Sequence, residues 1–326
     1  MSTKTKKGKG KSTGEEAISI VGVDLASKKF DVHCNGKHGV FPNTSLGLSR
    51  FKTYLGTLPG RVVVAFESTG SISRPFTRAM MNMGVEWRCL PPGAVRRYAD
   101  SMGIHAKTDA KDAKVIAKFT RERKPADTKA VTAKLLDLQE LMALRRLYVR
   151  DRAHYMTSLA AYRLEETRAA IRRKIAELDR DIAAVEKKID AIIAADEELA
   201  ARRKLYVREP GIGPCTAREL VCHLPELGTE ERRRLASLVG LAPYNRSSGN
   251  MDAPRHVRGG RKKVRTALYM AAIAVRRCRT GDVKEFYLRL KSRGKPNKLI
   301  AIACAHKMLL RLNAAVLGMK RAAAAT

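Results

Sequence analysis

The sequence lacks the cysteine pairs that mark zinc sites and disulfide frameworks. Its six cysteines are scattered, and none belongs to a Cys-x-x-Cys pair. No run of about 18 apolar residues occurs, and no charged-then-apolar signal segment opens the sequence. We therefore expect reduced thiols in a cytoplasmic protein that does not span a membrane.

Acidic residues are scarce relative to basic ones. The 326 residues include 65 Lys and Arg against 32 Asp and Glu, a net charge of +33. Such an excess repels itself in a compact fold and indicates a polyanionic partner, most simply nucleic acid. The alternatives are a generically basic surface or a chain neutralised within a ribosome-like assembly. Residues 1–16 form a basic, polar tail that we expect to be disordered.

Proline and glycine are missing from the middle of the sequence. No proline stands between Pro125 and Pro210, and no glycine between Gly103 and Gly211, which favours long helices. Apolar residues then follow one another at alternating steps of four and three, at Ile171, Ile175, Leu178, Ile182, Val185, Ile189 and Ile192. This heptad seam predicts a coiled coil over residues 128–204 that joins protomers. It is either one long helix or two antiparallel helices; the alternative is an amphipathic helix packed on its own domain.

Residues 17–127 alternate strand-like and helix-like stretches. Strands are expected over residues 18–23, 30–34, 39–41, 61–66 and 85–90, and helices over 46–58, 76–83 and 94–102. Asn35-Gly36 is a strong hairpin turn signal between two of the strands. The alternation predicts an α/β domain with a central mixed sheet.

Four carboxylates belong to this region. Asp24 and Glu67 each end a predicted buried strand, and Asp109 and Asp112 are three residues apart, so that they share one helix face. Acids gathered in this way repel one another unless a cation lies between them, and oxygen-only ligation suits Mg²⁺ or Mn²⁺. Two such ions can hold the attacking and leaving oxygens of a phosphodiester. Taken singly, each acid could be only a turn or helix cap, with Asp109 capping the helix after Thr108.

The C-terminal half is predicted to be mostly helical, with a Gly-rich turn near its start. Gly211 and Gly213, followed by a helix over residues 216–221, are similar to a helix-hairpin-helix turn. Glycines let a backbone approach a phosphate closely, and the next helix offers free N–H groups. A plain connection between two helices is the alternative.

A Gly/Ser/Asn/Pro-rich loop is expected around residues 243–260, followed by a helix over 268–278. Ser248 lies in this loop beside basic residues, the candidate nucleic-acid contacts Arg255, Arg258, Arg261, Lys262 and Lys263. A serine next to such cations can attack a phosphodiester, although a loop serine usually has no such role. The chain then ends in an apolar helix over residues 299–317 and an Ala-rich tail.

Segments 21–31, 66–70 and 107–113, which contain the four acids, resemble the RuvC-like DEDD domain of insertion sequence 110 family transposases. The resemblance implies an RNase H-like catalytic domain over 17–127, a coiled coil over 128–204, a transposase domain over 205–318 and a tail over 319–326. It implies the metal-binding catalytic tetrad Asp24, Glu67, Asp109 and Asp112. It also implies a nucleophilic serine in a Ser-Gly pair after Gly-Leu-x-Pro, which matches Ser248, with Ser247 as the adjacent alternative.

The same resemblance implies an activity and its partners. A DNA recombinase of a mobile element would use Ser248 to form a 5′-phosphoserine and a free 3′-hydroxyl, and would exchange strands through a four-way junction. A structured guide RNA, the bridge RNA, would pair with donor and target double-stranded DNA. Homodimers or homotetramers would form through the coiled coil. The protein would be cytoplasmic and associated with the prokaryotic nucleoid. The alternatives are a RuvC-like Holliday-junction nuclease without serine chemistry and a non-catalytic basic scaffold that binds RNA.

Overall fold

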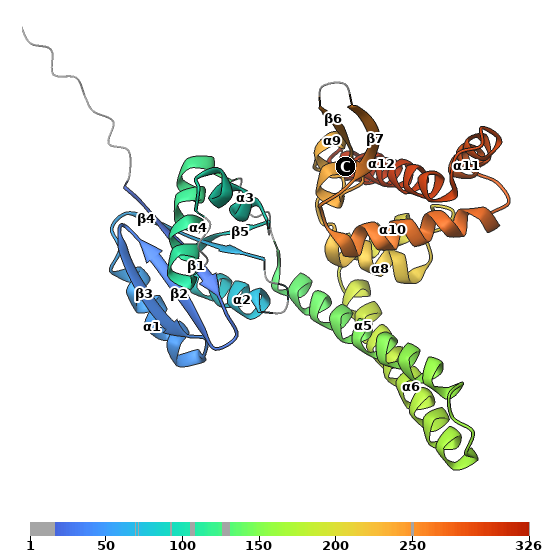
Figure 1. The fold of residues 1–326 in the computed structure, drawn as a ribbon, viewed down its shortest axis with the longest axis horizontal. Helices are drawn as coiled ribbons and strands as arrows, with labels where there is room; N and C mark the ends of the chain where they lie inside the picture. The colour runs from blue at the N-terminus through green and yellow to red at the C-terminus, as the bar shows by residue number, and fades with distance from the viewer. Residues whose placement is uncertain are drawn as a thin grey trace, which may run out of the picture. The chain divides into compact units, whose positions relative to one another are not determined.

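The computed structural model describes residues 17–68, 70, 72–91, 93–104, 108–125, 131–248 and 251–325, with the backbone alone at residues 245–248 and 251–255. The predicted N-terminal tail lies outside these ranges. The chain divides into two compact units, residues 1–131 and 132–326. Each unit is described by itself, and Figure 1 shows the elements of both.

Unit 1 is built on a five-stranded mixed sheet. Its strands are β1 (Ile18–Leu25), β2 (Lys29–Cys34), β3 (Lys37–Pro42), β4 (Arg61–Glu67) and β5 (Glu86–Leu90), in the order β3-β2-β1-β4-β5 (Figure 1). The first three strands form an antiparallel meander, and β4 and β5 run parallel to β1 and β4 respectively. Asn35 and Gly36 have positive φ values of 47° and 80°, as a two-residue hairpin turn requires. The predicted mixed sheet is confirmed.

Helices cover both faces of this sheet: α1 (Ser45–Gly56), α2 (Ser73–Met83), α3 (Ala94–Ser101) and α4 (Asp109–Arg123). A cluster rich in aromatic rings, including Phe30, Phe51, Phe66 and Phe76, fills the side of α1 and α2. A second cluster with Ala65, Tyr98 and Ile116 fills the side of α3 and α4. Alternate residues of β4 therefore supply the two cores, as the period of a strand requires.

Helix α4 lies unusually close to β1 because position 22 is glycine. A Cβ atom added to Gly22 would lie 2.2 Å from the Ala113 carbonyl oxygen and 2.5 Å from the Ala117 backbone nitrogen. Any side chain would overlap the helix backbone there. Gly22 therefore fixes the distance between α4 and the strand that ends in Asp24.

Unit 2 begins with a helical hairpin, α5 (Ala133–Leu159) and α6 (Glu165–Ala194). Ion pairs join Arg145 to Glu186 at 2.6 Å and Arg152 to Asp179 at 2.5 Å. From Arg145 to Arg152 the chain advances seven residues along α5, while their partners step back seven residues along α6, from Glu186 to Asp179. The two helices are therefore antiparallel. Of the predicted seam, Leu178, Val185 and Ile189 are buried in this single chain. A coiled coil between protomers stays a prediction.

The other helices of unit 2 are α7 (Glu197–Val207), α8 (Pro214–His223), α9 (Arg232–Val239), α10 (Lys262–Ala274), the short 3₁₀ helix η1 (Val275–Arg277), α11 (Asp282–Ser292) and α12 (Asn297–Ala324). Helix α12 contacts α7, α9, α10 and α11. By length and composition α12 is apolar enough to cross a membrane, and half of its most apolar window is buried inside the protein. Burial of Ile300, Cys304, Met308 and Leu312 is typical of a core helix.

The loop expected around residues 243–260 is wrong in part, because two antiparallel strands occupy most of it. They are β6 (Pro243–Ser248) and β7 (Met251–Val257), with Ser248 paired to Met251. The two prolines suggested a loop, but Pro243 begins its strand and Pro254 lies at a register irregularity, both positions that tolerate proline. Gly249-Asn250 between the strands is a recognised hairpin dipeptide that the sequence interpretation overlooked.

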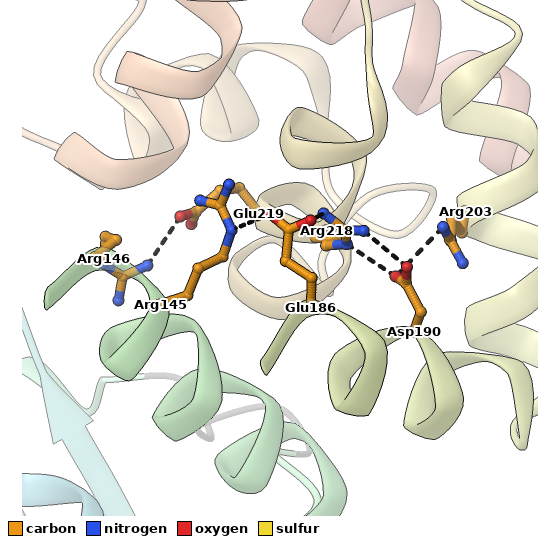
Figure 2. A network of polar contacts seen from close by, with 7 residues as sticks. All are labelled: Arg145, Arg146, Glu186, Asp190, Arg203, Arg218 and Glu219. Atoms are coloured by element: carbon orange, nitrogen blue, oxygen red, sulfur yellow. Dashed lines mark hydrogen bonds and ion pairs between the residues drawn. The ribbon is translucent and has the colours of Figure 1, made fainter. Parts of the chain in front are cut away.

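A polar network joins the hairpin to α8, as Figure 2 shows. Arg218, whose side chain is 8% exposed, bonds Asp190 at 2.8 and 2.7 Å and pairs with Glu186 at 3.0 Å. The hydrogen bonds from Arg218 lower the pKa of Asp190. Arg146 donates to Glu219 at 2.9 Å. These directional contacts fix how the hairpin base meets α8.

Candidate active site

Two of the predicted acids occupy matching positions on neighbouring strands. In the parallel pair β1 and β4, Val23 is the register partner of Phe66. Asp24 and Glu67 are the next residue of each strand, at the carboxyl ends. Because side chains at matching register positions point to the same face, both acids lie on one face at one edge of the sheet.

The face that carries these acids is the one that α4 covers. The position of a Cβ on Gly22 meets α4, and Asp24 follows Gly22 by two residues, so its side chain points the same way. Glu67 likewise follows Ala65, which packs with α3 and α4. Asp24 and Glu67 are each partly buried.

Asp109 and Asp112 lie in the first turn of α4. The cap of this helix is Thr108, whose side chain accepts a hydrogen bond from the Lys111 backbone nitrogen at 3.4 Å, so the interpretation of Asp109 as the cap is wrong. Lys29, at the start of β2, places its Nζ 2.9 Å from Asp109. Lys29 lies next to Phe30, the register partner of Leu25 at the carboxyl end of β1. Asp109 therefore reaches the sheet edge where Asp24 lies.

A fifth carboxylate, Asp31, belongs to the same face and was missed from the sequence. Asp31 is the register partner of Asp24 and is only 4% exposed. It accepts from His38 at 2.9 Å and pairs with Lys29 at 3.1 Å. The short connection of residues 26–28 between β1 and β2 could have found it, because a tight turn fixes which residue of β2 lies opposite Asp24.

Lys29 links two of these acids. Its ammonium lies between Asp31 and Asp109, and the hydrogen bonds to Asp109 and then Asp31 raise the pKa of Lys29. In the described ranges, no three His, Cys, Asp or Glu side chains are arranged as a metal site. The chemistry of the donors fits a hard divalent cation, because every acid at this edge offers oxygen; Lys29 occupies Asp109 and Asp31 in this structure.

Ser248 belongs to unit 2 and ends strand β6. The base of its hairpin is a close crossing of glycine backbones. A Cβ on Gly240 would lie 2.2 Å from the Gly259 carbonyl oxygen, and a Cβ on Gly260 would lie 2.3 Å from the Gly240 nitrogen. Gly240 of the Gly-Leu-x-Pro motif thus has a structural role: without a side chain, it lets the segment before β6 contact the segment after β7 at Gly259 and Gly260.

The basic residues predicted beside Ser248 have different environments. Arg261 is held by protein, with bonds of 2.6 and 2.5 Å to Glu226 and one of 2.9 Å to the His223 carbonyl. Arg258 lies over the Tyr244 ring at 5.4 Å from its centroid. Lys262 and Lys263 are exposed in the first turn of α10. The side chain of Arg255 lies outside the described part of the chain.

The two glycines of the predicted phosphate turn also differ. A Cβ on Gly211 would lie 2.7 Å from the Ala271 carbonyl oxygen and 2.9 Å from Val275. This glycine therefore has a packing role against α10. Gly213 is exposed, caps α8 and would meet nothing within 4 Å. Of the two, Gly213 has the open position that a phosphate contact needs.

Comparison with known proteins agrees with this arrangement. A family model described as a transposase, the DEDD model of the IS110 group, matches residues 21–166, and the model "Transposase IS116/IS110/IS902 family" matches residues 207–288. Together they span most of the chain. The protein belongs to the IS110 family of transposases. Members of this DEDD family use a divalent metal ion.

Named relatives extend over nearly the whole chain. The pilin gene-inverting protein of Moraxella bovis is 25% identical, covering 89% of this chain and 93% of its own length. The transposase for insertion sequence element IS1111A of Coxiella burnetii is 23% identical, covering 88% of this chain and 86% of its own. The transposase for IS1328 of Yersinia enterocolitica is 25% identical over 89% and 94%. The chain is accordingly a DNA transposase or recombinase.

Proposed function

We propose that this transposase moves a DNA element by divalent-metal-dependent strand cleavage through a covalent serine intermediate. The observation that carries the proposal is the shared position of Asp24 and Glu67 on one face and edge of the sheet, with α4, whose first turn carries Asp109 and Asp112, packed on that face. A structural sheet edge has no need of so many acids in a chain of net charge +33.

Asp24, Glu67, Asp109 and Asp112 would hold Mg²⁺, with Mn²⁺ as a substitute. The bound ion would offset negative charge on the scissile phosphate. Asp31 and Lys29 position the first turn of α4, because Lys29 bridges Asp31 and Asp109. The sheet would keep Asp24 and Glu67 in place when DNA is absent, and the close packing of α4 on β1 at Gly22 would hold the helix that carries Asp109 and Asp112.

Ser248 would act as the nucleophile. Its hydroxyl oxygen forms a bond to phosphorus, the bond from phosphorus to the 3′-oxygen breaks, and the serine proton leaves to solvent while the 3′-oxygen gains one. The products are a 5′-phosphoserine and a free 3′-hydroxyl. Reversal with a different 3′-hydroxyl joins new strands and restores the serine, so the reaction needs no external energy source.

Partners complete the proposal. Donor and target double-stranded DNA are the substrates, and a structured guide RNA selects them by base pairing. Two or four protomers assemble through the α5–α6 hairpin, on seam residues that stay only partly buried in the single chain, such as Ile171, Ile175 and Ile182. The net charge of +33 is consistent with a protein that holds several polyanions at once. Exposed Gly213, Arg258, Lys262 and Lys263 stay candidate phosphate contacts.

Trapping of the covalent intermediate tests the serine. A duplex labelled on the 3′ side of the cleavage site, incubated with Mg²⁺ and the co-purified RNA, should give a labelled band that co-migrates with protein in denaturing gels. Ser248→Ala should abolish this band, and the matched variant Ser247→Ala should keep it. Cleavage by Ser248→Ala, with or without joining, would overturn the mechanism, and cleavage without joining would favour a junction nuclease.

Removal of one acid tests the metal site. Asp24→Asn should lower cleavage by about 10³-fold, since loss of several kcal/mol of charge stabilisation has that effect, while RNA and DNA binding persist. Direct Mn²⁺ titration of the same variant should show weaker binding. Unchanged cleavage in Asp24→Asn and in Asp112→Asn would overturn the proposal and favour a non-catalytic scaffold.

A further inference from the structure

One short part of unit 2 carries a charge out of proportion to its length. Residues 276–298, the α11 segment, contain nine Lys and Arg but only two acids, Asp282 and Glu285. Residues 133–194, which include the α5–α6 hairpin, contain thirteen Lys and Arg against ten acids. The basic excess of the protein is therefore not evenly spread.

The cations of the two regions also differ in pairing. On the hairpin, Arg145, Arg152, Arg172 and Lys174 each have an acid within 3.0 Å. Within the described ranges, no ion pair with an acid is made by seven cations of the α11 segment: Arg276, Arg277, Arg279, Lys291, Arg293, Lys295 and Lys298. Asp282, one of the two acids here, pairs instead with Arg311 of α12. The segment holds exposed positive charge that the protein does not neutralise.

These seven cations form two groups at the two ends of α11. The first group, Arg276, Arg277 and Arg279, precedes the helix, and Lys284 ties it to the first turn by donating to the Arg276 carbonyl at 2.7 Å. The second group, Lys291, Arg293, Lys295 and Lys298, follows in a stretch where every residue from 291 to 299 is exposed. Since α11 has 11 residues, the groups are about 16 Å apart along it.

Helix dipoles explain only part of this pattern. Arg276 and Arg277 end η1, and Lys291 lies in the last turn of α11, where positive charge is favourable. Lys298 lies in the first turn of α12, where the helix dipole disfavours a cation. Arg293 is the C-cap of α11, where positive charge is also favourable, and Lys295 belongs to the connection between the two helices. Lys295 and Lys298 therefore have no local reason to be basic.

We infer that the α11 segment binds the phosphate backbone of double-stranded DNA, with its two groups on the two strands that border one groove. The inference rests on the proposed function. The spacing of about 16 Å is comparable with the ~12 Å opening of the B-DNA major groove plus the bordering phosphates. Double-stranded RNA fits less well, because its major groove is deep and narrow.

Salt dependence of binding tests the surface, because each lost phosphate contact lowers the slope of log K against log salt by about 0.9. The full chain is titrated with a labelled duplex that lacks any recombination site, by fluorescence anisotropy at several salt concentrations. The variant Lys291→Gln/Arg293→Gln/Lys295→Gln/Lys298→Gln should lower the slope by about 3–4 and the affinity at least tenfold. Circular dichroism checks that the helices persist.

The matched control removes four exposed charges from α6: Arg173→Gln/Arg180→Gln/Lys187→Gln/Lys188→Gln. It should keep the slope within about one of the natural protein. An equal loss in both variants would overturn the inference, since net charge alone would then set affinity. Unchanged DNA binding with lost binding of an RNA duplex would overturn it too. Ser248→Ala should leave the slope unchanged, so failure of the serine mechanism and failure of this surface give different results.

Discussion

The two units solve the problem of packing helices in different ways. Unit 1 contains six of the seven phenylalanines and the single tryptophan, Trp87, and its rings contact one another, as in the 5.1 Å pair of Phe66 and Phe76. Unit 2 has 195 residues and one phenylalanine, Phe286. It packs helices through aliphatic side chains such as Leu138, Ile189 and Leu309 and through the arginine–carboxylate network of Figure 2.

The difference teaches what each unit can tolerate. Large rings around a sheet give a rigid edge, which suits acids that must keep their places. A buried charge network specifies one arrangement of helices, but it fails when one partner is removed. Because Trp87 belongs to unit 1 and most helical residues belong to unit 2, fluorescence and circular dichroism report on the two units separately.

Among these variants, Arg218→Met is expected to change the difference in stability between the two units most. It removes the buried cation that bridges Asp190 and Glu186, which keep only Arg203 and Arg145 respectively, so unit 2 should lose at least about 2 kcal/mol through the lost charged hydrogen bonds. Urea unfolding followed by circular dichroism at 222 nm should show the loss, with the Trp87 fluorescence midpoint unchanged. Arg203→Met, which removes a more exposed partner 3.3 Å from Asp190, should cost less than about 1 kcal/mol. Equal midpoints for the two variants would refute the role of the network.

Gly22→Val should affect unit 1 instead. The new side chain would overlap the backbone of α4 at Ala113 and Ala117, at a cost of about 2 kcal/mol through overpacking. The Trp87 fluorescence midpoint should fall, and DNA cleavage should fall with it because α4 carries Asp109 and Asp112. Gly39→Val is the matched strand control, since its Cβ would meet only Phe41 at 3.6 Å. A shift as large in Gly39→Val would contradict the close-contact explanation.

Thiol labelling should give the smallest and most local readout. Burial raises the pKa of Cys222 to about 12 and that of Cys304 to about 11, so at pH 8 both stay protonated and unreactive in the folded protein. Cys215 is exposed and should react first. In rising urea, Cys34 of unit 1 should become reactive with the Trp87 transition, and Cys222 with the circular dichroism transition. Simultaneous exposure of both thiols would show that the units unfold as one.

Much of the fold follows from local sequence. The order of strands and helices in residues 17–125 was predicted from β-branched runs, the Asn35-Gly36 turn and helical periodicity, and the structure confirms it within a few residues. The antiparallel helical hairpin was one of two interpretations of the long Pro- and Gly-free stretch. Periodicity could not choose between them, because one helix and two helices place the same residues on the apolar face.

The sequence by itself determined which residues can carry chemistry: the acids at the ends of β1 and β4, the pair in α4, and the basic excess. Only the tertiary structure decided which of them meet. Strand register places Asp24, Glu67 and Asp31 on one face. Long-range contacts pair Arg261 with Glu226 and pack Gly211 against α10. The physical reason is that propensity acts over a few residues, whereas register and ion pairs depend on partners distant in the chain.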